Sequence, residues 1–144
     1  MDTSREGFVA VPFTLDIERG KIREFARAVH AEHPDYASEQ PVIPPTFLTT
    51  TFHAEQDVPG SNPWVVVDMS LERGLHAEQE YVFFGPPPRA GTRLACQARI
   101  ERIYQKQGRR GGTLTFAVMV TEFHDESGRL VASATLTGVE TSGL

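Results

Sequence analysis

The residues with the clearest capacity for chemistry lie in one short segment near the end of an amphipathic stretch. His30 and His33 are accompanied there by Glu32 and Asp35. An imidazole beside a carboxylate can move a proton to or from water, and the four side chains could also bind a metal ion. Histidines three positions apart at a fraying helix end are more often polar surface, and a helix C-terminus would favour His30 in any case. We therefore assign no catalytic pair and no metal site to this segment.

Other chemically capable side chains are scattered along the chain. His53 and Glu55 come late in an apolar segment and would matter only if they faced a partner subunit, whereas His76 is interpreted as tying a strand start to a neighbouring loop. The single cysteine, Cys96, excludes an internal disulfide and a multi-thiolate zinc site. It falls in an alternating apolar run, which predicts a small buried side chain.

The elements that must position these groups begin with an apolar segment at residues 8–15. Pro12 lies inside it and favours a short edge strand or an extended entry. From Ile17 the apolar spacing becomes helical, and Pro34 then bars continuation, which leaves an irregular loop through Gln40. The apolar positions of this helix are Ile22, Phe25, Ala26 and Val29.

A second helix is predicted over Thr46–Gln56, because Pro44 and Pro45 precede it and proline is tolerated in a helix's first turn. Its few charges predict a largely buried helix, with Phe47, Leu48 and Phe52 in the core. Residues 57–63 (DVPGSNP) read as a loop. Trp64–Met69 fits a helical turn or a strand, and the pattern does not decide between them.

The second half of the chain predicts antiparallel sheet. A strand at Glu80–Phe84 is followed by a long strand in which Leu94, Cys96, Ala98 and Ile100 alternate with polar or small residues. After a turn at Gln107–Gly112, another strand has two distinct faces, and Leu130–Val139 closes the sheet. In the strand that follows the turn, one face carries Leu114, Phe116, Val118 and Val120, and the other face carries Thr113, Thr115, Met119 and Thr121. Early helices and a later meander indicate an α+β fold whose sheet packs one face on a helix.

Length and charge restrict the class of protein. The chain has 144 residues, which fits one domain over residues 1–144, and its net charge of −5 argues against nucleic-acid binding. Its densest basic cluster, Arg109 and Arg110, is interpreted as a solvated hairpin tip. No apolar run is long enough to span a bilayer, and the start MDTSREG is unlike a signal peptide, so a cytoplasmic protein is the default expectation.

Four blocks in order resemble the N-terminal type of MaoC-like dehydratase domain, over about Glu18 to Thr141. They are ERGKIREFARAVHAEHPDY, PPTF, LHAEQEYVFFGPPPRAGTRL and EFHDESGRLVASATLTGVET. The resemblance implies a hot-dog fold, in which an antiparallel sheet wraps around one buried central helix. It also implies pairing with a second hot-dog domain and a role in hydrating or dehydrating acyl thioesters.

In catalytically complete members of the family, an Asp-x-Asn-Pro-x-His loop supplies the acid and the base. Aligning that motif on Pro34 puts Ala31 at the aspartate position and Tyr36 at the histidine position. Alanine cannot orient water, and a tyrosine with a reference pKa of about 10 is a poor base near neutrality. Pro44 and Pro45 also lack the backbone N–H groups that would hold a thioester oxygen.

The resemblance therefore implies an accessory subunit that has no catalytic pair and no cofactor, and that holds an acyl-CoA or acyl-carrier-protein thioester for a catalytic hot-dog partner. Two alternatives remain open: a non-catalytic acyl-thioester-binding homodimer, and a hot-dog thioesterase that uses Glu55. Chain length is not indicated, and Arg89 and Arg93 are weak candidates for contacting a phosphate. The expected substrate-binding residues are Tyr36, Pro45, Thr46, Phe47, Leu48 and Phe52.

Overall fold

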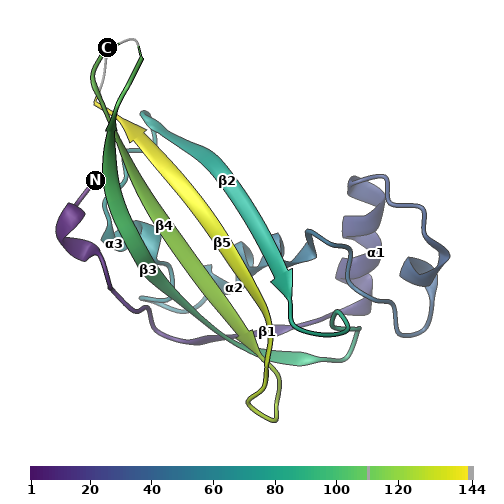
Figure 1. Ribbon diagram of the computed structural model, residues 1–144. Helices are drawn as coiled ribbons and strands as arrows, with labels where there is room; N and C mark the ends of the chain where they lie inside the picture. The colour runs from purple at the N-terminus through teal and green to yellow at the C-terminus, as the bar shows by residue number, and fades with distance from the viewer. Residues whose placement is uncertain (110, 143–144) are drawn as a thin grey trace.

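The computed structural model describes residues 1–109 and 111–142. Within them, the chain forms a five-stranded antiparallel sheet in the order β1-β3-β4-β5-β2 (Figure 1). This confirms the predicted sheet and the α+β class. The strands are β1 (Phe13–Asp16), β2 (Gly74–Phe83), β3 (Arg93–Gln107), β4 (Thr113–His124) and β5 (Leu130–Thr141).

The helices are short and come before or between the first strands. Figure 1 shows α2 and α3 on one face of the sheet and α1 beyond one end of it. Residues 64–66, left open by the sequence pattern, belong to the short helix α3. The elements are the 3-10 helices η1 (Thr3–Arg5), η2 (Pro34–Ala37) and η3 (Phe47–Thr50), and the α-helices α1 (Arg19–Ala28), α2 (Thr51–Gln56) and α3 (Pro63–Val66).

The prediction of one helix over Thr46–Gln56 is wrong in part, since the segment divides into η3 and α2. Three consecutive threonines, Thr49–Thr51, lie at the junction, and β-branched residues lose side-chain freedom in an α-helix. The buried positions of this segment are Phe47, Leu48, Thr51 and Glu55. Phe52 was predicted to be core, but 53% of it is exposed, because Thr51 and Glu55 present the inward face of α2.

The long strands follow period-two alternation, and the pairing shifts register at three places, between His76 and Glu78, Ile100 and Arg102, and Phe123 and His124. The predicted inward positions of β3 from Leu94 to Ile100 are all buried, and a register shift between Ile100 and Arg102 then changes the pairing with β4. The two faces predicted for β4 are observed. The face with Met119 and Thr121 is the buried one, and the more apolar face is half-buried on the other side of the sheet.

The sheet has two edge strands. β1 pairs with β3 alone and is therefore an edge strand. This confirms the edge position predicted for the segment around Pro12. β2 begins at Gly74, earlier than predicted, because an edge strand with one exposed face accepts the polar residues His76–Glu80. The tip between β3 and β4 carries Arg109 exposed, while Arg110 lies outside the described residues.

The core lies between the sheet and the η3–α2 segment. Phe47 and Leu48 are fully buried there, and the Phe47 ring meets that of Phe25 edge-on, with centroids 5.5 Å apart. Strands β1, β3, β4 and β5 supply most of the rest of this cluster, and Ile17, Ile22 of α1 and Ile43 complete it. In the described part of the chain, no helix is long and apolar enough to cross a membrane. The arrangement is a sheet wrapped around a short central helix, as the family resemblance implied.

Candidate functional site

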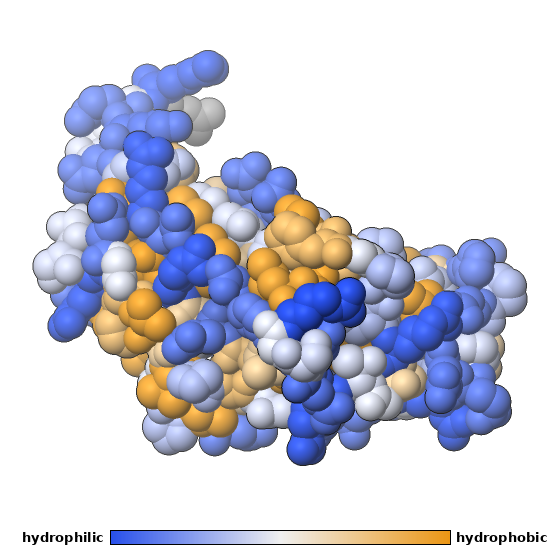
Figure 2. Space-filling view, turned by 60° about the horizontal axis from the view of Figure 1, so that its bottom comes forward, coloured by the Kyte–Doolittle hydropathy of each residue, from blue (hydrophilic) through white to orange (hydrophobic). Residues whose placement is uncertain are grey.

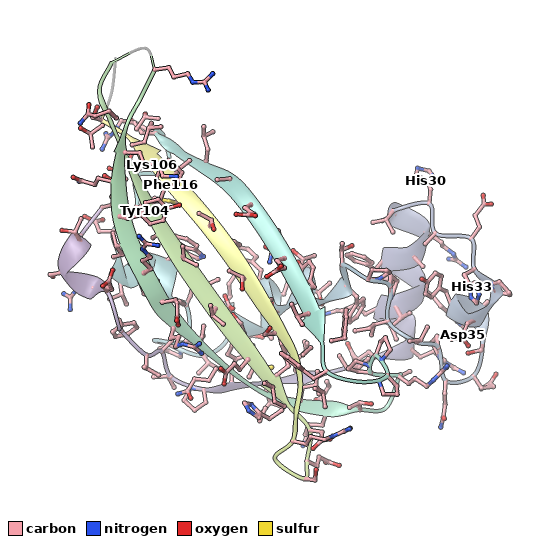
Figure 3. All side chains as sticks on the ribbon, in the orientation of Figure 1. His30, His33, Asp35, Tyr104, Lys106 and Phe116 are labelled. Carbon is pink, nitrogen blue, oxygen red and sulfur yellow. The ribbon has the colours of Figure 1, made fainter. Side chains whose placement is uncertain are left out.

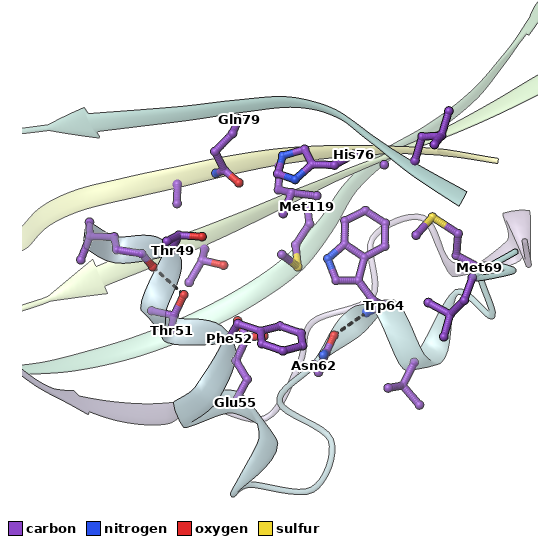
Figure 4. Close-up of a pocket in the computed structure, with 18 of the residues that line it drawn as sticks. Thr49, Thr51, Phe52, Glu55, Asn62, Trp64, Met69, His76, Gln79 and Met119 are labelled. Atoms are coloured by element: carbon purple, nitrogen blue, oxygen red, sulfur yellow. Dashed lines mark hydrogen bonds between the residues drawn. The ribbon is translucent and has the colours of Figure 1, made fainter. Parts of the chain in front are cut away.

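A cavity of about 630 Å³ lies between the concave face of the sheet and the helices α2 and α3 (Figure 4). Its lining is mostly apolar. The residues come from the η3–α2 segment, from α3 and the loop after it, and from the inward faces of β2, β4 and β5. They include Leu48, Phe52, Trp64, Met69, Tyr81, Met119, Ala134 and Leu136.

The cavity exists because the central helix stops early. The hydroxyl of Ser61 donates to the carbonyl of Glu55 at 2.7 Å, which satisfies an acceptor at the end of α2. The side-chain oxygen of Asn62 then accepts from the N–H of Trp64 at 2.9 Å, and Pro63 occupies the first turn of α3. Between the two helices, part of the concave sheet face is left uncovered.

Gly138 of β5 allows α3 to approach the sheet. A Cβ atom at this position would lie 2.8 Å from the ring of Trp64 and 3.2 Å from the sulfur of Met69. Any side chain there would push the indole away from the sheet. Gly138 thus determines how closely the Trp64 side of the cavity approaches the sheet.

Glu55 is the unusual polar group of the cavity. Only 4% of the residue is exposed, and within the described residues its carboxylate forms no hydrogen bond. Loss of hydration raises its pKa to about 7. Some other polar side chains on the wall already have partners, among them His76, whose ring Nε2 lies 3.1 Å from the carbonyl oxygen of Glu78. The hydroxyl of Thr51 donates to the carbonyl of Leu48 at 2.7 Å, and the amide of Gln79 donates to the carbonyl of Thr135 at 3.1 Å.

The mouth of the cavity has an apolar rim. Phe52, Val65, Leu71 and Leu75 line it and are nevertheless exposed, Val65 and Leu71 to 78% and 91%. Figure 2 shows hydrophobic patches between hydrophilic side chains on one face of the molecule. Exposed apolar surface around an opening is typical of a place where a ligand or another chain binds.

The segment from His30 to Tyr36 lies elsewhere, around the end of α1 (Figure 3). His30 and His33 are exposed, and His30 has a left-handed backbone with a φ of 54°. The ring Nδ1 of His33 accepts from the N–H of Asp35, and Asp35 forms an ion pair with Arg89 at 3.1 Å. Hydrogen bonding from Arg89 lowers the pKa of Asp35. Asp35 therefore holds the loop in place, and among the described residues its carboxylate has no imidazole partner.

Neither interpretation of this segment as a reaction centre gains support from the geometry. Among the described residues, no group of three histidine, cysteine or acidic side chains could hold a metal ion. Ala31 and Tyr36 line a separate hollow of about 460 Å³ together with Glu32 and His33, and among the described residues none lines both this hollow and the larger cavity. Ala31 brings no titratable group to this hollow.

The expected substrate-binding residues divide into four groups by location. Leu48 and Phe52 line the large cavity, and Phe47 lies in the core behind it. Pro45 and Thr46 are exposed at the start of η3, outside the cavity. There the N–H of Phe47 donates to the carbonyl of Pro44 at 2.9 Å, so this donor is already used. Tyr36 belongs to the smaller hollow.

Several wall residues were missed from the sequence. Thr121, Ala134 and Gly138 are small or polar side chains facing inward on β4 and β5, which in a sheet that wraps a helix marks a place where the core is not filled. Trp64 and Met69 come from the segment whose structure the pattern left open. Glu55 was considered only as a group that could face a partner subunit or direct a hydrolysis.

Three other candidates take no part in the cavity. Arg89 pairs with Asp35, and Arg93 pairs with Asp16 at 2.7 Å, so each guanidinium already has a carboxylate partner. Cys96 is buried as predicted. Burial raises the pKa of its thiol to about 12, which keeps it protonated and unreactive.

Comparisons with known proteins agree with this architecture. A family model described as "FAS1-like, dehydratase domain region" matches residues 5–134. A UPF0336 protein of Streptomyces griseus is 32% identical over 129 residues, which cover 83% of this chain and 80% of the relative.

Two solved structures show the same fold. A chain of the C-terminally truncated HadBC (3R-hydroxyacyl-ACP dehydratase) complex from Mycobacterium tuberculosis superposes with a TM-score of 0.75 at 24% identity, over 96% of this chain and 99% of that one. A MaoC-like dehydratase gives 0.77 at 23% identity, over 95% of this chain and 42% of that one. The hot-dog fold implied by the sequence is confirmed.

Proposed function

We propose a function for this chain on the premise that it belongs to the FAS1-like dehydratase domain family, as the match over residues 5–134 shows. In this proposal the chain is the accessory half of a MaoC-like enoyl-thioester hydratase or 3-hydroxyacyl-thioester dehydratase. It holds the acyl group in the large cavity. A second hot-dog chain supplies the acid and the base.

The observation that carries the proposal is the absence of a proton-transfer pair where the family motif would put one. Ala31 has no titratable group, and Tyr36, at the histidine position, lies in a hollow that is separate from the large cavity. Adding water across a conjugated thioester needs a base for the water and an acid for the α carbon. A chain without both needs them from a partner.

The size and lining of the cavity support the acyl-binding half of the proposal. Its volume of about 630 Å³ lies within the range of cavities that bind small molecules, and such cavities are mostly apolar. An alkyl chain gains about 0.8 kcal/mol for each methylene group removed from water. We propose Leu48 and Phe52 as residues that contact it, with the strand side chains Met119, Ala134 and Leu136 opposite.

The rim of the cavity supports a partner. Phe52, Val65, Leu71 and Leu75 expose apolar surface that a second chain would cover. The structurally similar HadBC dehydratase is itself a complex of unlike chains. A heterodimer is therefore our first choice over a homodimer that only binds thioesters. Native mass spectrometry of the chain purified from its source would distinguish them, since a homodimer would contain no second kind of subunit.

The isolated chain is expected to hydrate enoyl thioesters no faster than a buffer control, because Ala31 and Tyr36 stand where the family motif has its aspartate and histidine. The test is a spectrophotometric assay of the purified chain with crotonyl-CoA and a longer enoyl-CoA. His76→Ala removes the imidazole that lines the cavity, and His30→Ala and His33→Ala remove those of the loop after α1. Turnover by the isolated chain that any of these substitutions abolishes would disprove the accessory role.

A further inference from the structure

We propose that Glu55 recognises a hydroxyl group on the bound acyl chain, at a position away from the reacting carbons. The inference rests on the proposed function, because it concerns the occupant of the same cavity. It names the chemical class of that occupant as a hydroxylated acyl thioester.

The geometry of Glu55 is that of a ligand-facing group. The residue is 4% exposed, it lines the cavity, and its carboxylate has no hydrogen-bond partner in the described part of the chain. Figure 4 shows its side chain rising from α2 behind the ring of Phe52, toward the cavity. The hydroxyl of Ser61 satisfies the backbone carbonyl of Glu55 and leaves the carboxylate free.

Burying a carboxyl group without a hydrogen-bond partner costs free energy. A ligand that supplies the missing hydrogen bond removes this cost. No lysine or arginine lines this cavity among the described residues, and the ring Nε2 of His76, which does line it, lies 3.1 Å from the carbonyl oxygen of Glu78. Within these residues Glu55 therefore has no ion-pair partner in the wall. A hydroxyl group both donates and accepts, and therefore matches a protonated acid and a carboxylate alike. A methylene chain matches neither form, and a ketone matches the protonated form alone.

The hydroxyl must lie away from the double bond if the partner chain performs the reaction. The carbons next to the thioester then lie at the partner's acid and base. Glu55 belongs to this chain's cavity and would contact a later carbon. The wall around it is otherwise apolar, with Leu48, Phe52 and Met119 available to the alkyl portion.

The test is a binding titration of lauroyl-CoA and a positional series of hydroxylauroyl-CoA esters, including the ω-hydroxy ester. The full chain is used alone and with its co-purified partner. At least one hydroxylated ester should bind about tenfold more tightly than lauroyl-CoA. Glu55→Leu should abolish that preference, and Glu55→Gln should retain part of it, since an amide also donates and accepts. Glu78→Gln, at an exposed position of β2, is the matched control and should change nothing.

The outcomes separate the inference from the proposed function. Equal binding of all esters to the unaltered chain, or a preference that survives in a folded Glu55→Leu variant, would overturn the role of Glu55 alone. Failure of every ester to bind would overturn the acyl-binding function as well. Release of free CoA that Glu55→Gln abolishes would make Glu55 a hydrolytic group, and would also overturn its role in recognition.

Discussion

Replacing Ala134 by phenylalanine is expected to lower kcat/KM of the two-chain enzyme for a long-chain enoyl thioester roughly 100-fold. Ala134 lies on the cavity wall, paired across the sheet with Thr121 and Tyr81, and a phenyl ring there would occupy space now empty. Displacing about four methylene groups would cost about 3 kcal/mol of binding at about 0.8 kcal/mol each. The measurement is steady-state hydration kinetics of the complex.

The neighbouring substitution Ser133→Phe is the matched control. Successive strand residues point to opposite faces, so this ring would lie outside the cavity, beside Val82 and Glu122. Its kinetics should match those of the unaltered complex. Crotonyl-CoA is too short to fill the cavity, so Ala134→Phe should lower kcat/KM for this substrate only a few-fold. An equal loss for short and long substrates would show that the cavity does not bind the acyl chain.

The second large effect concerns stability and pH. Burial raises the pKa of Glu55 from its ordinary value of 4.5 to about 7. Between these values the folded chain keeps a proton that the unfolded chain has lost, so this residue makes the free energy of unfolding fall as pH rises. The loss is complete above pH 7. It amounts to about 3 kcal/mol, at about 1.4 kcal/mol for each unit of pKa.

Glu55→Gln should remove this dependence, since an amide does not titrate in this range. The variant and the unaltered chain are expected to be about equally stable near pH 4. By pH 8 the variant should be more stable by up to about 3 kcal/mol, measured by urea unfolding at a series of pH values. The nearby thiol of Cys96 stays protonated throughout, because its pKa is about 12. A stability difference that does not change with pH would show that Glu55 is hydrated in the folded chain.

Much of the fold could be predicted because burial repeats with a fixed period. In β3 the alternation from Leu94 to Ile100 identified every buried position, since both neighbours in the sheet constrain that strand. In β4 the same reasoning found the two faces without showing which was inside. Leu114, Phe116, Val118 and Val120 are the more apolar set, yet the face with Thr121 is buried, because the central helix lies on that side.

The site was harder to predict than the fold, because a cavity is a place where side chains are missing. Composition predicted a buried helix over Thr46–Gln56, but not that α2 would end early and leave the sheet uncovered. The position of Trp64 depends on the missing side chain of Gly138 in a distant strand, which a local pattern does not register. Glu55 has an ordinary sequence context, and burial alone makes its carboxyl group unusual.

The central proposal is that this chain binds the acyl group while the partner chain supplies the acid and the base. A crystal structure of the complex with an unreactive enoyl-thioester analogue tests it most directly. The acyl chain is expected in the cavity bounded by Phe52, Trp64 and Ala134, with a carboxylate and an imidazole of the partner chain on one water molecule beside the double bond. A carboxylate and an imidazole of this chain holding that water would contradict the account.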